Sequence, residues 1–243
     1  TSGTPDTALL NAFDLVIISR SVPSGNYQSA AQTLLWNGVT APTMILGGYV
    51  IRQNRLGYMT GNTIPDTAGP INLTVTNPSH PIFKDIPLDA GNTTVNPYAD
   101  LVSFSGTVQR GISVVTDAPS ASGTVLATVA AGADPASGGM IIGEWKAGAA
   151  LSNGAADVLA GDRLIFLTGS REASGLTSEG AGIFDLSADG AQMFLNAVNY
   201  MAGTVPGEAA PTLSVSRTAN GISLTFTGTL QSADAVAGPF TDV

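Results

Sequence analysis

Two nearly continuous apolar runs separated by one amphipathic stretch open the chain, at Phe13–Ile18 and Thr43–Leu46. Continuous hydrophobicity is typical of strands buried on both faces, as in parallel sheets. Between the runs, apolar residues recur at helical spacing, namely Tyr27, Ala30, Ala31, Leu34 and Leu35. Ser24 or Asn26 is the expected N-cap of this helix and Gly38 its end. The pattern predicts a strand–helix–strand unit with a right-handed crossover.

Shorter, alternating patterns occupy residues 50–135. Ile71–Val75, Ser113–Thr116 and Thr124–Val129 have β-like patterns, and Asn77-Pro78 and His80-Pro81 interrupt the chain between them. Alternation is typical of strands with one face in solvent. We therefore expect an inserted β-rich region or an antiparallel edge here.

Buried-strand patterns return at Met140–Trp145 and Arg163–Leu167. A last helix is predicted from about Asp189 to Met201, with Ser187 as its N-cap. Its expected buried face consists of Ala191, Phe194, Leu195 and Val198. The alternation of buried strands with amphipathic helices is typical of α/β proteins. Residues 1–205 are thus predicted to form a three-layer α/β domain with a mostly parallel sheet and an inserted β-rich region.

The composition changes at residues 206–211, a Pro-, Gly- and Ala-rich stretch that predicts a linker. Beyond it, Leu213–Ser216 and Ile222–Phe226 alternate strictly around the turn Asn220-Gly221. Residues 212–243 are therefore expected to form a short C-terminal β appendage, too short for a complete sandwich.

Composition narrows the classes of partner. The net charge is −9, charged residues make up 11% of the 243 and hydrophobic ones 44%, which indicates a globular chain without the basic stripe that nucleic acid requires. Its apolar runs are far shorter than a membrane-spanning helix needs, so no membrane insertion is expected. The lack of cysteine excludes disulfides and thiolate chemistry. Few lysines and many Thr, Ser, Asn and Gly residues suggest an extracellular or cell-surface protein.

Two resemblances add to this picture. Phe13–Tyr58, the turn His80-Pro81-Ile82 and the ending Arg163–Ala202 resemble the class I glutamine-amidotransferase-like superfamily, in particular its trehalose-utilisation-type branch. This resemblance implies a flavodoxin-like fold. Gly228–Asp234 and Gly238–Val243 are similar to part of a C-terminal β-module of large secreted proteins from environmental bacteria.

Domains of this superfamily usually have a strand, a helix and another strand before the segment equivalent to Phe13–Ile18. Only twelve residues precede that segment here, and the tail stops abruptly at Val243. The resemblance therefore suggests a piece of a longer protein. A position in its sheet would then be empty or filled by a neighbouring chain.

The resemblance also defines which catalytic groups are missing. The family's chemistry needs a nucleophile on a tight turn after a strand and a His–Glu pair after a later strand. The positions that resemble the nucleophile turn are Gly47, Gly48 and Tyr49, and the later strand ends in Ser170-Arg171-Glu172 without a histidine. We therefore expect no glutaminase activity, and we assign no catalytic residue and no cofactor.

His80, the only histidine, lies in the turn-forming context Asn77-Pro78-Ser79-His80-Pro81. A structural turn role is favoured over a catalytic one, and Asn or Gln should replace His80 with little loss of any activity. There is no Gly-x-Ser-x-Gly motif for a serine hydrolase. Glu144-Trp145 could offer an acid beside a sugar-stacking ring, although packing is the favoured role of the tryptophan.

No metal is expected either. With one histidine and no cysteine, only oxygen ligands remain, which suit calcium or magnesium. Asp85 with Asp89, or Asp185 with Asp189, could contribute carboxylates, but solvated turn or helix-cap roles are favoured for them, above all for Asp189 in the first turn of its helix.

The strongest candidate site joins Ser19-Arg20-Ser21 with Ser170-Arg171-Glu172, each just past the end of a predicted parallel strand. Ligands of open α/β sheets bind at that edge. Two guanidiniums and a carboxylate suit an anionic or polyhydroxylated molecule, and the Cα atoms of Arg20 and Arg171 are predicted within about 15 Å of each other. The favoured alternative is an ion pair, Arg171 with Asp14 or Arg20 with Glu172.

The leading hypothesis is a non-catalytic binding or structural module of a larger extracellular bacterial protein. Its partners would be a carbohydrate or small polar ligand and the other domains of the parent protein, and a homo-oligomer also fits. The alternative is a hydrolase with a non-standard Ser, Asp or Glu site. A deep cleft holding a carboxylate with a raised pKa would favour that alternative.

Overall fold

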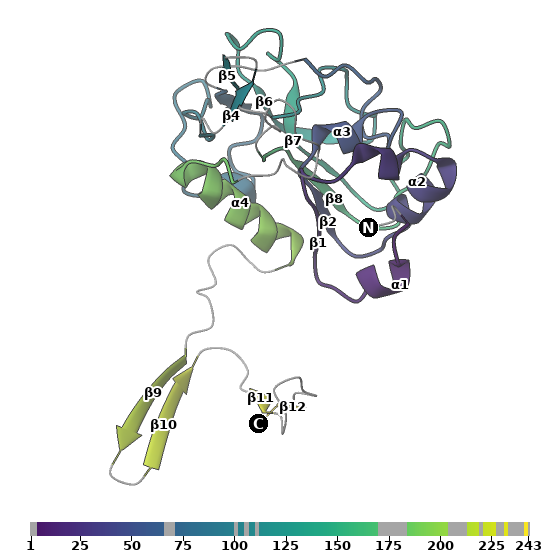
Figure 1. Cartoon of the computed structure of the whole chain (residues 1–243). Coiled ribbons are helices and arrows are strands. Elements are labelled where there is room, and N and C mark those ends of the chain that lie inside the picture. Colours follow the sequence, from purple (N-terminus) through teal and green to yellow (C-terminus); the bar gives the residue numbers. More distant parts are fainter. Residues whose placement is uncertain are drawn as a thin grey trace. The chain divides into compact units, whose positions relative to one another are not determined.

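The computed structural model describes residues 4–65, 71–99, 112–169 and 184–203 in full, together with the backbone of short strands within 102–109 and 213–242. The chain divides into two compact units, Thr1–Pro206 and Gly207–Val243. Each unit is described by itself (Figure 1).

A six-stranded sheet forms the centre of the first unit (Figure 1). Its strands, in spatial order, are β1 (Val16–Ile18), β2 (Thr43–Ile45), β8 (Arg163–Phe166), β7 (Met140–Trp145), β6 (Thr124–Val129) and β3 (Leu73–Val75). Strands β1, β2 and β8 run parallel to one another. The pairs β8–β7, β7–β6 and β6–β3 are antiparallel.

The expected three-layer, mostly parallel, flavodoxin-like sheet is therefore wrong. The sheet is mixed: β1, β2 and β8 are parallel, with α2 in the connection between β1 and β2, whereas β7, β6 and β3 are added through antiparallel pairs. The connection from β7 to β8, residues 146–162, contains no helix and folds back through a bridge between Ala150 and Val158. Burial on both faces gave Met140–Trp145 the composition of a parallel strand, but burial does not determine strand direction.

Six helical segments accompany this sheet in the described part of the unit. They are α1 (Thr7–Leu10), η1 (Ser24–Tyr27), α2 (Ala30–Asn37), α3 (Gly48–Ile51), η2 (Pro81–Phe83) and α4 (Ala188–Met201). The expected single helix around residues 24–38 is divided into η1 and α2. Ser29 is the N-cap of α2, not Ser24 or Asn26, because its side chain accepts from Gln32 N while the Gln32 side chain accepts from Ser29 N. Gly38 is the C-cap, as predicted.

Helix α2 buries a different face from the one predicted. In α4 the prediction is correct for Ala191, Phe194 and Val198, which pack against the core, and wrong for Leu195. In α2, Leu34 is 65% exposed, whereas Thr33 and Asn37 are buried. Asn37 is satisfied there, since its amide donates to Leu56 O and to Asp157 Oδ2. In α4, which begins after the predicted N-cap Ser187, Leu195 is 56% exposed. The buried residues of α4 are Gly190, Met193, Asn196, Ala197 and Met201.

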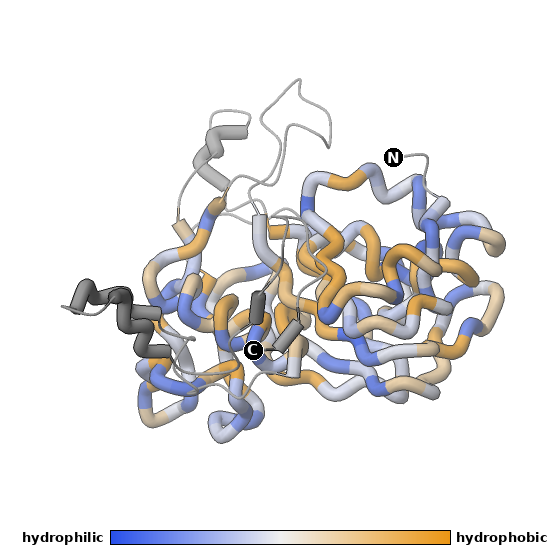
Figure 2. The backbone as a smooth tube through the Cα atoms, turned by 90° about the horizontal axis from the view of Figure 1, so that it is seen from below, coloured by the Kyte–Doolittle hydropathy of each residue, from blue (hydrophilic) through white to orange (hydrophobic). Residues whose placement is uncertain are grey.

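A large hydrophobic core fills the described part of the first unit, with a small second cluster of Val16, Val39 and Ala41, and Figure 2 shows apolar segments in orange. The largest fully buried side chains include Trp145, Tyr58 and Phe166, with the charged Arg163 among them. Elsewhere in this unit, β4 (Val102–Phe104) pairs antiparallel with β5 (Thr107–Gln109).

The second unit contains two antiparallel pairs. Strand β9 (Leu213–Thr218) pairs with β10 (Gly221–Phe226), in a register that matches Thr218 with Gly221. This is the pair of alternating strands that the sequence predicts. Strand β11 (Gln231–Ser232) pairs with β12 (Thr241–Asp242).

Candidate functional site

The parallel strands β1, β2 and β8 bring three following segments to one edge of the sheet. Leu46 N donates to Ile18 O at 3.0 Å, and Thr168 N donates to Leu46 O at 3.2 Å, so the ladder continues past the strand ends. Ser19-Arg20, Gly47 and Thr168-Gly169 therefore lie where open α/β sheets bind ligands.

A cavity of about 170 Å³ lies at this edge. It is lined by Ser19, Arg20, Leu46, Thr168, Gly169, Phe184, Asp185, Leu186 and Phe194. We name it the Arg20–Asp185 cavity. Arg20 is only 5% exposed and Asp185 only 1% exposed, whereas Phe184 is 69% exposed. The cavity thus combines buried charged groups with an exposed aromatic ring.

Asp185 is the most unusual group of the cavity. Its Oδ1 accepts hydrogen bonds from Thr168 Oγ1 at 2.6 Å and from Gly169 N at 2.9 Å. Its Oδ2 is buried and has no hydrogen-bond partner among the described residues. Burial raises the pKa of Asp185 above its ordinary value, although these two hydrogen bonds and the Arg20 guanidinium act in the opposite direction. A buried oxygen in this state is open to a further partner.

Two of the predicted site residues, Ser19 and Arg20, line the cavity. Ser21 does not line it. Its hydroxyl lies 3.0 Å from Ser19 Oγ, and its N–H donates to the same oxygen at 3.2 Å, so the two serines close a local turn. Ser170, Arg171 and Glu172 lie outside the described residues, as do the predicted Arg20–Arg171 proximity and both alternative ion pairs.

Sequence reasoning missed Thr168 and Asp185 as site residues. Asp185 was expected in a solvated turn or cap, yet it is buried. One signal could have identified it: it stands between Phe184 and Leu186, and a lone carboxylate among large apolar residues is costly to bury unless other groups compensate it.

The turn that resembles a nucleophile turn leads from β2 into α3, but it has no room for a nucleophile at Gly48. A Cβ atom built there would lie 1.5 Å from Ser113 O, far inside van der Waals contact. The next residue, Tyr49, places its ring near two guanidinium groups, with ring centroids 5.8 Å from Arg20 Cζ and 5.0 Å from Arg52 Cζ. The turn is filled by backbone and by cation–aromatic packing.

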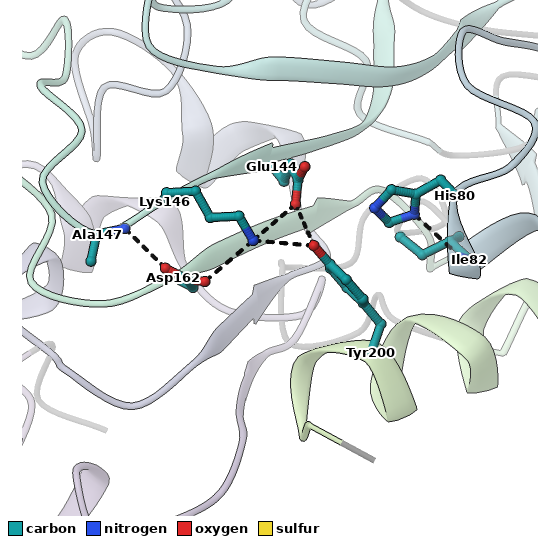
Figure 3. Close-up of polar contacts among 7 residues, drawn as sticks. All are labelled: His80, Ile82, Glu144, Lys146, Ala147, Asp162 and Tyr200. Carbon is teal, nitrogen blue, oxygen red and sulfur yellow. Dashed lines mark hydrogen bonds and ion pairs between the residues drawn. The ribbon is translucent and has the colours of Figure 1, made fainter. Parts of the chain in front are cut away.

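A second polar cluster lies at the other end of the sheet, where β7 ends and β8 begins (Figure 3). Lys146 Nζ lies 3.2 Å from Glu144 Oε2 and 3.3 Å from Asp162 Oδ2, and it donates to Tyr200 Oη at 3.1 Å. Tyr200 Oη donates to Glu144 Oε2 at 2.8 Å. These contacts tie α4 to the β7–β8 connection.

The protonation states of Lys146 and Tyr200 make neither side chain suited to act as a general base. Burial lowers the pKa of Lys146, but the hydrogen bond to Tyr200 and the charge of Glu144 outweigh burial, and the net pKa is raised. Burial, the largest cause, raises the pKa of Tyr200. At neutral pH the lysine is therefore charged and the tyrosine neutral, which is the arrangement of a structural ion-pair network.

His80 packs beside this cluster with its ring 4.7 Å from the Tyr200 ring, edge to face (Figure 3). It is 8% exposed and is the N-cap of η2, where its Nδ1 accepts from Ile82 N at 3.3 Å. The turn position predicted for His80 is thus the one observed.

His80 should make the folded protein sensitive to mild acid. Burial lowers the pKa of His80; Glu144 raises it and Lys146 lowers it further. The unfolded chain therefore binds a proton more readily, so the contribution of neutral His80 is fully present above about pH 6.5 and is lost as the pH falls through and below that value. Urea unfolding at a series of pH values should show that the free energy of unfolding falls less steeply with decreasing pH in His80→Asn than in the unaltered protein. Equal slopes for both proteins would contradict this assignment.

Glu144 and Trp145 do not form a sugar-binding pair. Glu144 is engaged by Lys146 and Tyr200. Trp145 is 1% exposed, and its Nε1 donates to Ser120 Oγ at 2.7 Å. The packing role favoured for this tryptophan is the one observed.

No group of three or more metal-ligating side chains occurs among the described residues. Asp89 Oδ1 accepts from Gly91 N and Thr93 N, which closes a turn, and Asp189 lies in the first turn of α4. In the same part of the chain, no helix has the length and apolar character needed to cross a membrane.

No protein-family model matches this chain, and no curated protein matches it significantly. Among solved structures, it is similar to a cytoplasmic protein from Salmonella typhimurium, with 10% identity and a TM-score of 0.42, over 80% of this chain and 74% of the other. This similarity is too slight to assign a family or a function.

The extracellular or cell-surface location expected from composition is not supported by any finding; the Salmonella protein is described as cytoplasmic, a word that applies to that protein alone. Low lysine content and abundant small polar residues do not by themselves target a protein to a compartment, so composition does not support an extracellular location.

Proposed function

We propose that the first unit is a non-catalytic binding module that holds a small polyhydroxylated molecule, such as a monosaccharide, in the Arg20–Asp185 cavity. The observation that carries this proposal is Asp185 Oδ2, a buried oxygen without a hydrogen-bond partner among the described residues. Leaving such an oxygen unpaired costs about 1–3 kcal/mol. A ligand hydroxyl that donates to it would recover this free energy.

The lining of the cavity supports a sugar-like ligand. Arg20 supplies donors, Asp185 an acceptor, and the exposed ring of Phe184 an apolar surface on which the face of a sugar ring can lie. The volume of about 170 Å³ is below the roughly 300 Å³ at which drug-sized pockets begin. A single ring therefore fits this cavity better than a chain of sugars.

The absence of a catalytic triad supports binding without turnover. The chain has no cysteine, and its one histidine packs against Tyr200, in the cluster at the opposite end of the sheet. The tight turn after β2 has no space for a side chain at Gly48. Acyl transfer of the amidotransferase type would need a cysteine nucleophile and a histidine base within reach of each other.

The test is a titration of the full chain with a panel of neutral monosaccharides, in which binding is measured by calorimetry and by NMR. Asp185→Asn replaces an acceptor by a donor at Oδ2 and should weaken binding at least about tenfold. Affinity of the unaltered protein should also rise with pH as Asp185 ionises, because the carboxylate is the better acceptor, and this trend should disappear in the variant.

Asp14→Asn is the matched control, because it makes the same charge change at an exposed site. It should bind as the unaltered protein does. If no sugar of the panel binds, or if Asp185→Asn binds equally well, the proposal is wrong.

A hydrolase is the second candidate, because one specific observation favours it. Asp185 has a raised pKa and lies 2.6 Å from the Thr168 hydroxyl, next to Arg20, so an acid or base stands beside a potential nucleophile and a cation. Turnover of chromogenic esters or glycosides that vanishes in both Asp185→Asn and Thr168→Val would favour this candidate. Ligand binding without any turnover would favour the binding module.

A further inference from the structure

A second cavity, of about 290 Å³, lies between the start of α2, the turn after α3 and the loop 153–155. It is lined by Gln28, Ala30, Thr33, Gln53, Asn54, Arg55, Asn153, Gly154 and Ala155. We name it the Arg55 cavity. It shares no lining residue with the Arg20–Asp185 cavity.

Arg55 is a cation without a counter-charge in the part of the chain that the structure describes. Its Nη1 donates to Asn54 O at 2.9 Å, while its Nε is buried and has no hydrogen-bond partner among the described residues. Within the same residues, no carboxylate lies at ion-pair distance from its guanidinium. The chain carries 18 acidic residues and only 9 Lys and Arg residues, so an arginine left without an acidic partner is unexpected.

Arg52 adds a second such charge nearby. It donates from Nε to Tyr49 O at 3.1 Å and from Nη2 to Ser24 Oγ at 3.5 Å, and no carboxylate of the described residues pairs with it. Burial lowers the pKa of Arg52, and repulsion from Arg55 lowers it further. Burial likewise lowers the pKa of Arg55. Two guanidiniums that disfavour each other create a positive field that an anion would relieve.

The remaining walls of the cavity offer neutral hydrogen-bonding groups. The side chains of Gln28, Gln53 and Asn54 make no hydrogen bond with any described residue, so their amides are available to a ligand. Asn153, by contrast, is fixed by two hydrogen bonds to Asp157, at 2.8 and 3.0 Å, and forms a rigid wall. Free amides around one guanidinium suit a ligand that carries several hydroxyls together with one anionic group.

We propose that the Arg55 cavity binds a small polyol that carries an oxyanion, a sugar acid or a sugar phosphate. The carboxylate or phosphate pairs with the Arg55 guanidinium in the fork geometry that arginine favours. The hydroxyls of the polyol bind to the amides of Gln53, Asn54 and Gln28. This site does not depend on the function proposed for the Arg20–Asp185 cavity.

The experiment is a calorimetric titration of the full chain, at low and at moderate salt, with four probes: glucuronate, glucose 6-phosphate, glucose and inorganic phosphate. Glucuronate or glucose 6-phosphate should bind, glucose should bind at least tenfold more weakly at this site, and binding should weaken as salt rises. Arg55→Gln should reduce the affinity at least tenfold. Arg55→Lys keeps the positive charge but not the planar guanidinium, and its affinity should lie between those of the unaltered protein and Arg55→Gln.

Lys84→Gln is the matched control, because it removes one positive charge from an exposed position that does not line the cavity. It should leave the affinity unchanged, and so should Asp185→Asn in the other cavity. NMR signals of the Gln53 and Asn54 side-chain amides should shift on binding, which locates the ligand even if Arg55→Gln is poorly folded.

Binding of glucuronate alone identifies a carboxylate as the anionic group, and binding of glucose 6-phosphate alone identifies a phosphate. Both outcomes support the proposal. It is overturned if neither probe binds, if Arg55→Gln binds as tightly as the unaltered protein, or if inorganic phosphate binds as tightly as the polyols. Loss of binding in Asp185→Asn but not in Arg55→Gln would assign the ligand to the Arg20–Asp185 cavity and overturn this inference alone.

Discussion

Replacing Arg163 by methionine should lower the free energy of unfolding by about 3–5 kcal/mol. The Arg163 side chain is 2% exposed, and no carboxylate among the described residues pairs with it. Its guanidinium instead donates to five main-chain carbonyls, those of Trp36, Asn37, Val39, Ala41 and Asp162. Methionine fills a similar volume but gives up all five hydrogen bonds, and among the described residues Val39 O is left without a donor.

Urea unfolding at neutral pH measures this effect. Arg163→Lys should recover only part of the loss, because one ammonium cannot reach carbonyls on several sides as a planar guanidinium does. Lys146→Met serves as the control. The Lys146 side chain is 59% exposed, and its ion pairs should contribute no more than about 1 kcal/mol. A loss below about 1 kcal/mol in Arg163→Met would show that the hydrogen bonds of Arg163 contribute little to stability.

Gly48→Ala should be the second severe substitution, with a loss of at least about 3 kcal/mol. The new methyl group would lie 1.5 Å from Ser113 O, which is a backbone atom and cannot rotate away. Either α3 or the segment around Ser113 must move, and both contribute to the core through Val50 and Val114.

The control for this prediction is Gly25→Ala, because nothing lies within 4 Å of a Cβ atom at Gly25. It should change the thermal midpoint little. A Gly48→Ala protein that melts close to the unaltered one would mean that the contact between the turn and Ser113 relaxes without cost.

Strand positions were the most predictable part of this fold. Thr124–Val129 and Met140–Trp145 are observed with the predicted bounds, as β6 and β7, and Ser187 is the N-cap of α4. Local patterns determine such features, because each depends on residues close in sequence. Strand direction depends on the path of the connections, and the turns of residues 146–162 gave no signal that β7 and β8 would be antiparallel.

The buried helix faces show another limit of periodicity. Asn37 is buried because Asp157, 120 positions along the chain, provides its partner. The periodicity of apolar residues alone would place an asparagine on the solvent-exposed face of the helix. The same limit applies to the candidate site. Arg20 could be predicted because it follows a strand end. Asp185 could not, because it is held in the cavity by a hydrogen bond from Thr168, a contact between residues far apart in the sequence.

The hydrogen bonds of Arg163 should stabilise the core in a way that depends little on pH or salt. Its acceptors are main-chain carbonyls, which do not titrate. Dissolved ions screen exposed charges far more than buried ones. Acid should therefore loosen the end of the sheet where His80 packs, and added salt should weaken the exposed Lys146 contacts, while the junction of β8 with the residues between α2 and β2 persists. Partial unfolding of this protein in acid is expected to begin at the end of the sheet where His80 and Lys146 lie.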